Sequence, residues 1–288
     1  GIHCLEDALK ALNYDEVGII SIVAQDTYLT DSTVLGQLNN VGRFAPSNFS
    51  LTGNLVAACT TSNAFNYFGQ PISEVSFSLT ALNQNGSRTV NYYDGFDKLT
   101  SLGLQVEHEG SLLDRLENIN AIGWPQSGAT GQISFSDNDI TFSRLSGTAL
   151  DGAYINAAIV LVADSGQIEG ANFNGLSCGG SCVDDFGGAI SFAYGRATLI
   201  NNYGGADEAL LLPLRTQYWD GQTWRINAND SCTDFEHANI TDASGELISS
   251  EDGTLSEGAY TTGEGMRLSS PNGAGNYPVS YPPDAWLL

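Results

Sequence analysis

Two groups of residues could support catalysis in this sequence. Residues 175–179 (GLSCG) match the G-x-S-x-G pattern in which hydrolases present a nucleophilic serine. That pattern works where a strand turns sharply into a helix, and the Gly-, Ser- and Asn-rich flanks predict neither element. His3, His108 and His237 could act as general bases, but each is more simply a surface residue of an acidic chain. We therefore predict no catalytic residue and no enzyme.

Acidic clusters could support glycoside hydrolysis or bind a cation. Glycosidases need two carboxyl groups about 5–10 Å apart across a cleft, which neighbours in one loop, such as Asp184 and Asp185, rarely provide. Calcium prefers carboxylate, amide and carbonyl oxygens. Asp137, Asn138 and Asp139 place three such side chains together, although no D-x-D-x-D-G pattern is present. This triplet is the predicted place for Ca²⁺, and no other cofactor is expected.

Aromatic residues could form a carbohydrate-binding face, because their planes stack on the apolar faces of sugar rings. Tyr218, Trp219 and Trp224 are the candidates for a glycan face. In β-proteins such residues are more often half-buried pairs between neighbouring strands. Both readings stay open at this point.

The elements that would position these aromatic residues form a predicted hairpin. Apolar residues alternate along residues 210–218, and Asp220-Gly221 then supplies turn chemistry. A two-residue loop would pair Gln217 with Trp224, and a three-residue loop would pair Tyr218 with Trp224. We favour the three-residue loop because it keeps the apolar side chains on one face.

The sequence pattern of the whole chain predicts an all-β protein. Period-two alternation recurs from residue 48 onward, and 33 glycines suit tight turns between short strands. One short helix is predicted over residues 111–119 (SLLDRLENI), where Ser111 could cap the helix and leucines recur at helical spacing. Residues 4–13 have a similar spacing. The predicted fold is a tandem of immunoglobulin-like β-sandwich domains with one short helix.

Two features suggest domain boundaries. Pro46 has no backbone N–H to donate a hydrogen bond to a neighbouring strand, so we expect a strand to end there. Residues 163–188 are rich in Gly, Ser and Asp and read as a linker. We therefore predict an N-terminal segment over residues 1–45 that ends a preceding β-domain, a first sandwich over residues 46–170, and a second sandwich over residues 171–288.

Charge and hydropathy limit the partners. The 33 acidic and 10 basic side chains give a net charge of −23, which repels the phosphates of nucleic acids and anionic membranes. No apolar stretch approaches the roughly 20 residues of a membrane helix, so we expect no membrane insertion. A cation, a glycan or another protein fits this surface, and the charge also favours solubility in salt.

Five short motifs follow one another in a recognisable order: YDEVG at 14–18, VGRFAP at 41–46, YFGQ at 67–70, PLRTQYWDG at 213–221 and DSCT at 230–233. Together they resemble the C-terminal region of MshQ-like proteins, a surface-protein family encoded with the mannose-sensitive haemagglutinin (MSHA) type IV pilus. In that region a similar Trp-Leu is followed by a further strand, so we expect the last sheet here to be incomplete at its C-terminal end.

The resemblance implies an extracellular, cell-surface β-protein that is exported through the periplasm, and it implies no reaction. The expected function is a non-enzymatic module for adhesion or pilus-tip assembly, with other pilus or surface proteins or glycans as partners. The first alternative is a structural subunit that forms homo-oligomeric filaments by strand exchange. A glycan-active enzyme is the third.

For an exported protein, the five cysteines indicate disulfides rather than metal ligands. We predict a Cys178–Cys182 bridge, which closes a short ring across two glycines, and a Cys59–Cys232 bridge between two strand ends. The partner of Cys4 stays open. The alternative is a loosely spaced zinc site with three cysteines and one histidine, Cys178, Cys182, Cys232 and His237.

Overall fold

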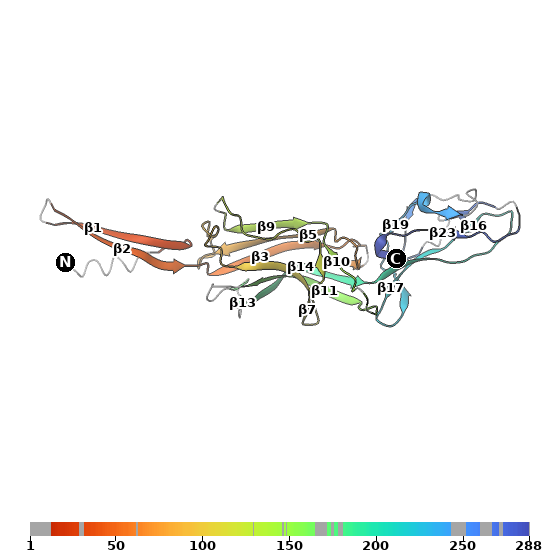
Figure 1. The fold of residues 1–288 in the computed structure, drawn as a ribbon, viewed down its shortest axis with the longest axis horizontal. Coiled ribbons are helices and arrows are strands. Elements are labelled where there is room, and N and C mark those ends of the chain that lie inside the picture. Colours follow the sequence, from red (N-terminus) through yellow and green to blue (C-terminus); the bar gives the residue numbers. More distant parts are fainter. Residues whose placement is uncertain are drawn as a thin grey trace.

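The computed structural model shows an elongated molecule with three parts in a row (Figure 1). A hairpin projects at the N-terminal end, a two-sheet sandwich lies in the middle, and a smaller C-terminal unit lies at the other end. The structure describes residues 13–28, 32–61, 63–128, 130–145, 147, 149–164, 172–173, 176–177, 181–242, 252–259, 267–270 and 273–287. No helix among these residues is long and apolar enough to cross a membrane.

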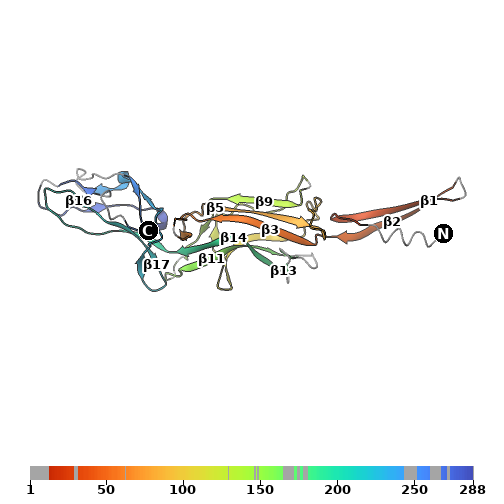
Figure 2. The same cartoon turned by 180° about the vertical axis from the view of Figure 1, so that it is seen from behind.

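The N-terminal hairpin consists of β1 (Gly18–Tyr28) and β2 (Ser32–Phe44), which pair antiparallel as a two-stranded sheet. Two register shifts near its base bend the ladder. Seen from either side, the hairpin extends away from the sandwich (Figure 1, Figure 2).

The sandwich, residues 48–193, contains two five-stranded sheets. One has the order β13-β12-β3-β5-β9 and the other β4-β14-β11-β6-β7, while β8 and β10 form a small pair beside them. The strands are β3 (Asn48–Val56), β4 (Phe65–Tyr67), β5 (Glu74–Leu82), β6 (Thr100–His108), β7 (Ser111–Leu113), β8 (Leu116–Glu117), β9 (Gln132–Asp137), β10 (Thr141–Phe142), β11 (Tyr154–Asp164), β12 (Asn172–Phe173), β13 (Leu176–Ser177) and β14 (Ser181–Ala193).

Strict alternation in β5 explains how the first sheet forms. Phe77 and Leu79 are buried, whereas the intervening Ser78 is only half-buried. Leu79 pairs with Leu51 in β3 and with Ile133 in β9, so three aliphatic side chains line up across the sheet on its core side. This cross-strand row fixes the register, because a shift by one residue would expose it.

The C-terminal unit, residues 195–287, has smaller sheets. A three-stranded sheet β15-β17-β18 is joined by the pairs β16-β22, β19-β21 and β20-β23. Its elements are β15 (Gly195–Leu199), β16 (Leu210–Leu211), β17 (Leu214–Trp219), β18 (Trp224–Ile226), β19 (Asp234–Phe235), η1 (His237–Asn239), β20 (Thr241–Asp242), β21 (Gly253–Thr254), β22 (Arg267–Leu268), β23 (Val279–Ser280) and η2 (Ala285–Leu287). The predicted all-β, sandwich-like fold class is thus confirmed.

The helix predicted over residues 111–119 is wrong. Glu109 and Gly110 have positive φ angles of 51° and 78° and form a tight turn, so Ser111 opens β7 opposite His108 instead of capping a helix. Leu116 then pairs with Phe142 in the β8-β10 ladder. Part of the leucine stripe is nevertheless used: Leu116 belongs to the sandwich core and Leu113 and Ile119 pack on it, whereas Leu112 is 44% exposed.

The boundary predicted after residue 170, and the linker predicted over residues 163–188, are also wrong. β14 begins at Ser181 and pairs with β11 and β4, so it is a central strand of the second sheet. The glycines of β14 indicated a linker in the sequence, but they are strand residues. A Cβ at Gly187 would lie 3.1 Å from the Leu55 nitrogen, so this glycine permits a close approach of β14 to β3.

The register predicted for the 210–226 hairpin is wrong by one residue. Trp219, not Tyr218, pairs with Trp224 across a four-residue loop. Asp220 is the cause: its Oδ1 accepts hydrogen bonds from the backbone nitrogens of Gln222 (2.9 Å) and Thr223 (2.7 Å). These bonds lengthen the turn, and they lower the pKa of Asp220 to about 2.

Gly53 in β3 lets the two sheets pack, because Phe186 of β14 lies directly over it. A Cβ there would overlap the Ser76 carbonyl oxygen and lie 2.7 Å from Phe186 Cδ2. We expect Gly53→Ala to lower the free energy of unfolding by about 1–3 kcal/mol, as overpacking does in cores. Urea denaturation measures this effect.

Gly103→Ala is the matched control. Gly103 also lies in a sandwich strand, but a Cβ there would meet nothing within 4 Å. It should change the free energy of unfolding by less than about 0.5 kcal/mol. Equal effects of the two substitutions would contradict the packing argument.

Candidate functional site

The candidate catalytic residues do not gather into one site among the described residues. The His108 ring lies edge-on to Tyr154 at 5.3 Å, at the end of β6. Asp184 and Asp185 are strand residues of β14 that pair with Leu161 and Val160. His3 and most of residues 175–179 lie outside the described residues.

Asp137 of the predicted calcium triplet has a structural role. It is buried, and both its carboxylate oxygens accept backbone hydrogen bonds at 2.9 Å: Oδ2 from Asn120 and Oδ1 from Asp139. Asn138 and Asp139 are exposed. The described residues place no group of three acidic, His or Cys ligands here, and calcium binding at this loop stays a prediction.

The three predicted glycan-face residues lie on two faces of the β17-β18 hairpin. The rings of Trp219 and Trp224 meet edge-on at 5.8 Å and pack against the sandwich core. Tyr218 points to the other side, where it packs on a cluster around Tyr67. The Arg196 guanidinium covers the Trp224 ring at 4.3 Å. Much of the aromatic surface therefore joins the C-terminal unit to the sandwich, and glycan contact stays a prediction.

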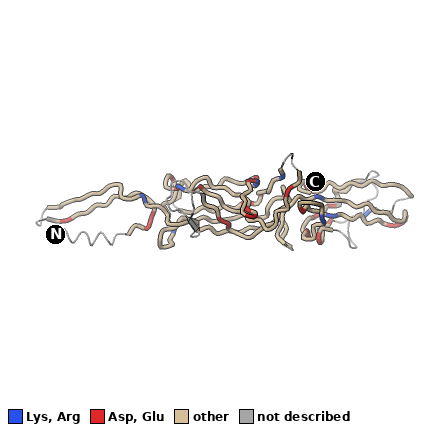
Figure 3. Tube along the Cα trace, turned by 90° about the horizontal axis from the view of Figure 1, so that it is seen from below, with Lys and Arg blue, Asp and Glu red and all other residues tan. Residues whose placement is uncertain are grey.

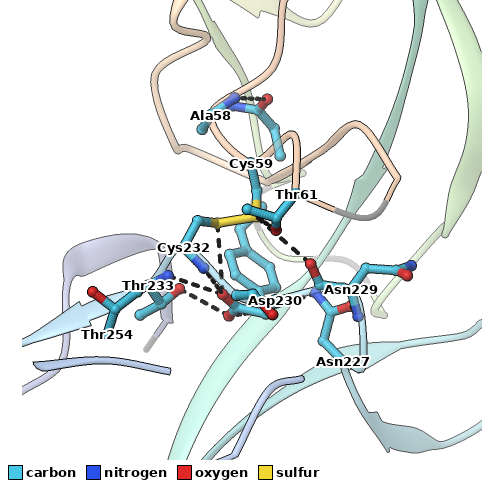
Figure 4. The surroundings of a disulfide bond; sticks show 12 residues. Ala58, Cys59, Thr61, Asn227, Asn229, Asp230, Cys232, Thr233 and Thr254 are labelled. Carbon is cyan, nitrogen blue, oxygen red and sulfur yellow. Dashed lines mark hydrogen bonds between the residues drawn. A yellow bond between two sulfur atoms is a disulfide. The ribbon is translucent and has the colours of Figure 1, made fainter. Parts of the chain in front are cut away.

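This junction is also covalent. Cys59, between β3 and β4 in the sandwich, forms a disulfide with Cys232, between β18 and β19, across 173 residues of sequence (Figure 4). The bridge confirms the predicted pairing. It also excludes the zinc alternative, which required Cys232 as a thiolate. Cys182 is disulfide-bonded as well; Cys178 lies outside the described residues, and the Cys178–Cys182 bridge stays a prediction.

A buried carboxylate lies beside the disulfide. Asp230 is fully buried, and Figure 4 shows it next to Cys232. Its Oδ2 accepts hydrogen bonds of 2.8 Å from Tyr67 Oη and from Thr233 Oγ1, and its Oδ1 accepts one of 2.9 Å from the Thr233 nitrogen. These donors are all neutral, and together they satisfy a group whose unpaired burial would be costly.

Tyr67 carries this network across the junction. It belongs to β4 of the sandwich and is fully buried, while its hydroxyl also accepts a 2.9 Å hydrogen bond from Asn227 Nδ2 of the C-terminal unit. Burial, followed by the negative charge of Asp230, raises the pKa of Tyr67 well above its ordinary value. The phenol therefore stays protonated and keeps donating to Asp230.

Two further contacts close the junction. Arg144 of the sandwich donates to the Trp286 carbonyl oxygen at 2.6 Å, so η2 at the C-terminal end lies on the sandwich. A Cβ at Gly195 would lie 2.9 Å from Leu287 and even closer to the Tyr67 ring. A side chain at Gly195 would thus separate the surfaces that meet here.

A second polar cluster lies inside the sandwich. Arg115 is buried, with its guanidinium 4.4 Å from the centre of the Phe142 ring and 2.5 Å from Asp151 Oδ2, which also accepts a 2.6 Å bond from Tyr154. Burial alone would raise the pKa of Asp151, but the bonds from Tyr154 and Arg115 lower it below its ordinary value. An ionised acid with a fixed arginine is a structural ion pair, not a proton donor.

Two family models match the chain, and the boundary between them coincides with the boundary between the two structural units. The third domain of DUF6701 matches residues 16–188, and the fourth domain of DUF6701 matches residues 193–288. The chain belongs to the DUF6701 family. No curated protein and no solved structure matches it. The sandwich with its hairpin is thus the third domain and the C-terminal unit is the fourth.

Sequence reasoning missed the Tyr67–Asp230 network, although the signal was present. YFGQ supplies Tyr67, PLRTQYWDG supplies Trp219, and DSCT supplies Asp230, Cys232 and Thr233. Three of the motifs that resemble the MshQ-like family therefore meet at the junction. We identify this junction between the third and fourth domains as the site around which these DUF6701 domains are built.

Removing the bridge tests its contribution. Replacing both cysteines (Cys59→Ser with Cys232→Ser) should lower the free energy of unfolding by about 2–5 kcal/mol, because the bridge closes a long loop. Chemical denaturation should then show the fourth domain unfolding before the third. The double variant is preferable to a reductant, which would also reduce the bond of Cys182. A single transition with an unchanged midpoint would contradict this role.

Tyr67→Phe tests the hydrogen-bond network. It removes one hydrogen bond of buried Asp230 and the acceptor of Asn227 Nδ2, and should cost about 1–3 kcal/mol. Because the folded pKa of Tyr67 is raised, its contribution is complete below the unfolded pKa of about 10 and is lost as pH rises further. Above that pH the free energy of unfolding should fall less steeply with pH in the variant than in the wild type. The two slopes should differ by up to about 1.4 kcal/mol per pH unit.

The control for Tyr67→Phe is Tyr203→Phe, at a side chain that is 93% exposed. It should change stability by less than about 0.5 kcal/mol. Parallel slopes for the wild type and Tyr67→Phe above pH 10 would count against the protonated Tyr67–Asp230 hydrogen bond.

Proposed function

We propose that this pair of domains is a stiff, non-enzymatic stalk segment of an exported surface protein of the MshQ-like, type IV pilus-associated kind, and that it serves adhesion or pilus-tip assembly. The observation that carries the proposal is the junction. A disulfide and a buried hydrogen-bond network both connect the third and fourth domains.

Domains in one chain usually move relative to each other unless their interface is large and apolar. Here the interface contains a covalent bond at Cys59–Cys232, two partly buried tryptophans and the fully buried Tyr67 and Asp230. Any rotation between the domains would break the hydrogen bonds of Tyr67 to Asp230 and Asn227. The contacts therefore favour one fixed orientation, which suits a segment that transmits position or force.

The cell-surface setting rests on two further observations. The disulfide favours an oxidising compartment, such as the periplasm or the cell exterior. Charged residues are scattered along the length of the molecule, with a strong excess of acidic side chains over the whole chain (Figure 3). Such a surface stays soluble and avoids nucleic acids. The link to the MSHA pilus rests on the motif resemblance.

A replacement experiment in bacteria that display a DUF6701 protein tests the stalk function. We expect that exchanging the third and fourth domains for a Gly/Ser linker of similar reach preserves surface display but lowers adherence several-fold. The variant with Cys59→Ser and Cys232→Ser should fall between the two. Display is measured by antibody labelling of intact cells and adherence by counting attached cells. Full adherence of the linker form would refute the proposal.

One observation favours the alternative of a filament subunit: within the part of the chain that the structure describes, neither edge of the β1-β2 hairpin pairs with another strand. Light scattering after size-exclusion chromatography separates the two functions. A mass that stays monomeric as concentration rises fits the stalk, and a growing mass fits the filament. A glycan array with and without Ca²⁺ tests the glycan alternative, and binding that needs Trp219 or Trp224 would support it.

A further inference from the structure

The β1-β2 hairpin is a two-stranded sheet with exposed apolar side chains. Among the described residues, its two strands pair only with each other. Large apolar side chains along it face solvent: Val23 is 60% exposed, Leu35 66% and Leu38 61%. Asp26 and Arg43 are the only charged residues within the two strands. This is an apolar, nearly uncharged surface on a strongly acidic chain.

The strand register assigns these side chains to two faces. Ile22 lies opposite Leu38, and the same face continues through Ile20 opposite Val41 at the base and through Asp26 opposite Val34 near the tip. We call this the Ile22/Leu38 face. The opposite face carries Val23 and Leu35, but they lie across from glutamines: Val23 from Gln37, and Leu35 from Gln25.

The first face is apolar except for Asp26 near the tip, and the second is mixed. Such a difference between faces is typical of an antiparallel sheet that covers a core on one side only. An isolated two-stranded hairpin is marginally stable in water. Open edges with apolar side chains also invite pairing with other chains. The hairpin therefore has the properties of two strands taken from a larger sandwich.

The position of the hairpin indicates which element covers it. It projects from the end of the third domain that lies opposite the fourth domain (Figure 1). The ordinal names of the matched family models place other domains before the third in DUF6701 proteins. The junction between the third and fourth domains also shows a hairpin of one domain, β17-β18, packing its tryptophans on the neighbouring core.

We propose that the β1-β2 hairpin, a part of the third domain, adds its two strands to the β-sandwich of the preceding DUF6701 domain, and that the second sheet of that sandwich packs on the Ile22/Leu38 face. That sheet would cover Ile20, Ile22, Leu38 and Val41, while Asp26 and its partner Val34 near the tip would lie at its edge. The other face stays at the surface. The third domain is then anchored to its predecessor by shared strands rather than by a flexible linker.

Hydrogen–deuterium exchange tests the proposal on two polypeptides: the present chain, and a DUF6701 polypeptide in which the second domain directly precedes this chain. The readout is the exchange rate of amides in β1 and β2, with β5 of the sandwich as an internal reference. In the present chain we expect fast exchange in the hairpin. In the longer polypeptide its exchange should slow by about 100-fold or more.

Two matched substitutions in the longer polypeptide identify the covered face. Leu38 and Leu35 both lie in β2 with nearly equal exposure, but they point to opposite faces. Leu38→Lys would bury a charge beneath the second sheet. It should therefore raise the exchange rate of the hairpin amides in the longer polypeptide by at least about tenfold. Leu35→Lys should leave the protection within about twofold.

Three results would overturn the proposal. Equal exchange of the hairpin in both polypeptides would show that the preceding domain does not cover it. Protection of the present chain that rises with concentration, together with a dimer mass by light scattering, would assign the face to a second copy. Protection of the present chain that disappears when residues 1–12 are deleted would assign it to that segment.

Discussion

The structure depends on one buried carboxylate whose hydrogen-bond donors come from two domains. Asp230 belongs to the fourth domain, but one of its donors is the phenol of Tyr67 from the third. Taking a carboxylate out of water is expensive unless hydrogen bonds replace the lost hydration. The loop from Asn227 to Thr233 is thus complete only when the two domains are docked, and the adjacent Cys59–Cys232 bridge keeps them docked.

Other features of the junction follow from this docking. Trp219 and Trp224 reach the sandwich core only because the fourth domain is held close to β4. The C-terminal η2 turn contacts Arg144 for the same reason. The two ends of the third domain differ as a result: one is closed by the fourth domain, and the other carries a hairpin with exposed apolar side chains (Figure 2). This asymmetry is expected of an internal segment in a row of domains.

The sequence predicted those parts of the fold that depend on local patterns. Alternation in β5 identified a half-buried strand, and the positions of Cys59 and Cys232 at strand ends predicted their bridge. The errors arose where distant or subtle interactions decide the structure. The helical spacing over residues 111–119 was overridden by the Glu109-Gly110 turn, and the Gly-rich strand β14 is stabilised by neighbours that are remote in sequence.

The junction itself could be predicted only in part. Its residues occur in recognisable motifs, but nothing local in YFGQ shows that Tyr67 donates to an aspartate 163 residues away. Partner identity in a buried network is a property of the packed structure, and sequence spacing does not encode it. Asp220 shows the same limit on a smaller scale, because its two backbone hydrogen bonds set the loop length of the β17-β18 hairpin.

The central claim is that the third and fourth domains form one rigid unit. Double electron–electron resonance between spin labels at the exposed positions Ser136 and Asp207, attached through non-natural amino acids that leave the cysteines intact, tests it most directly. The structure predicts a single narrow distance distribution. A broad distribution, or several separate distances, would contradict the claim.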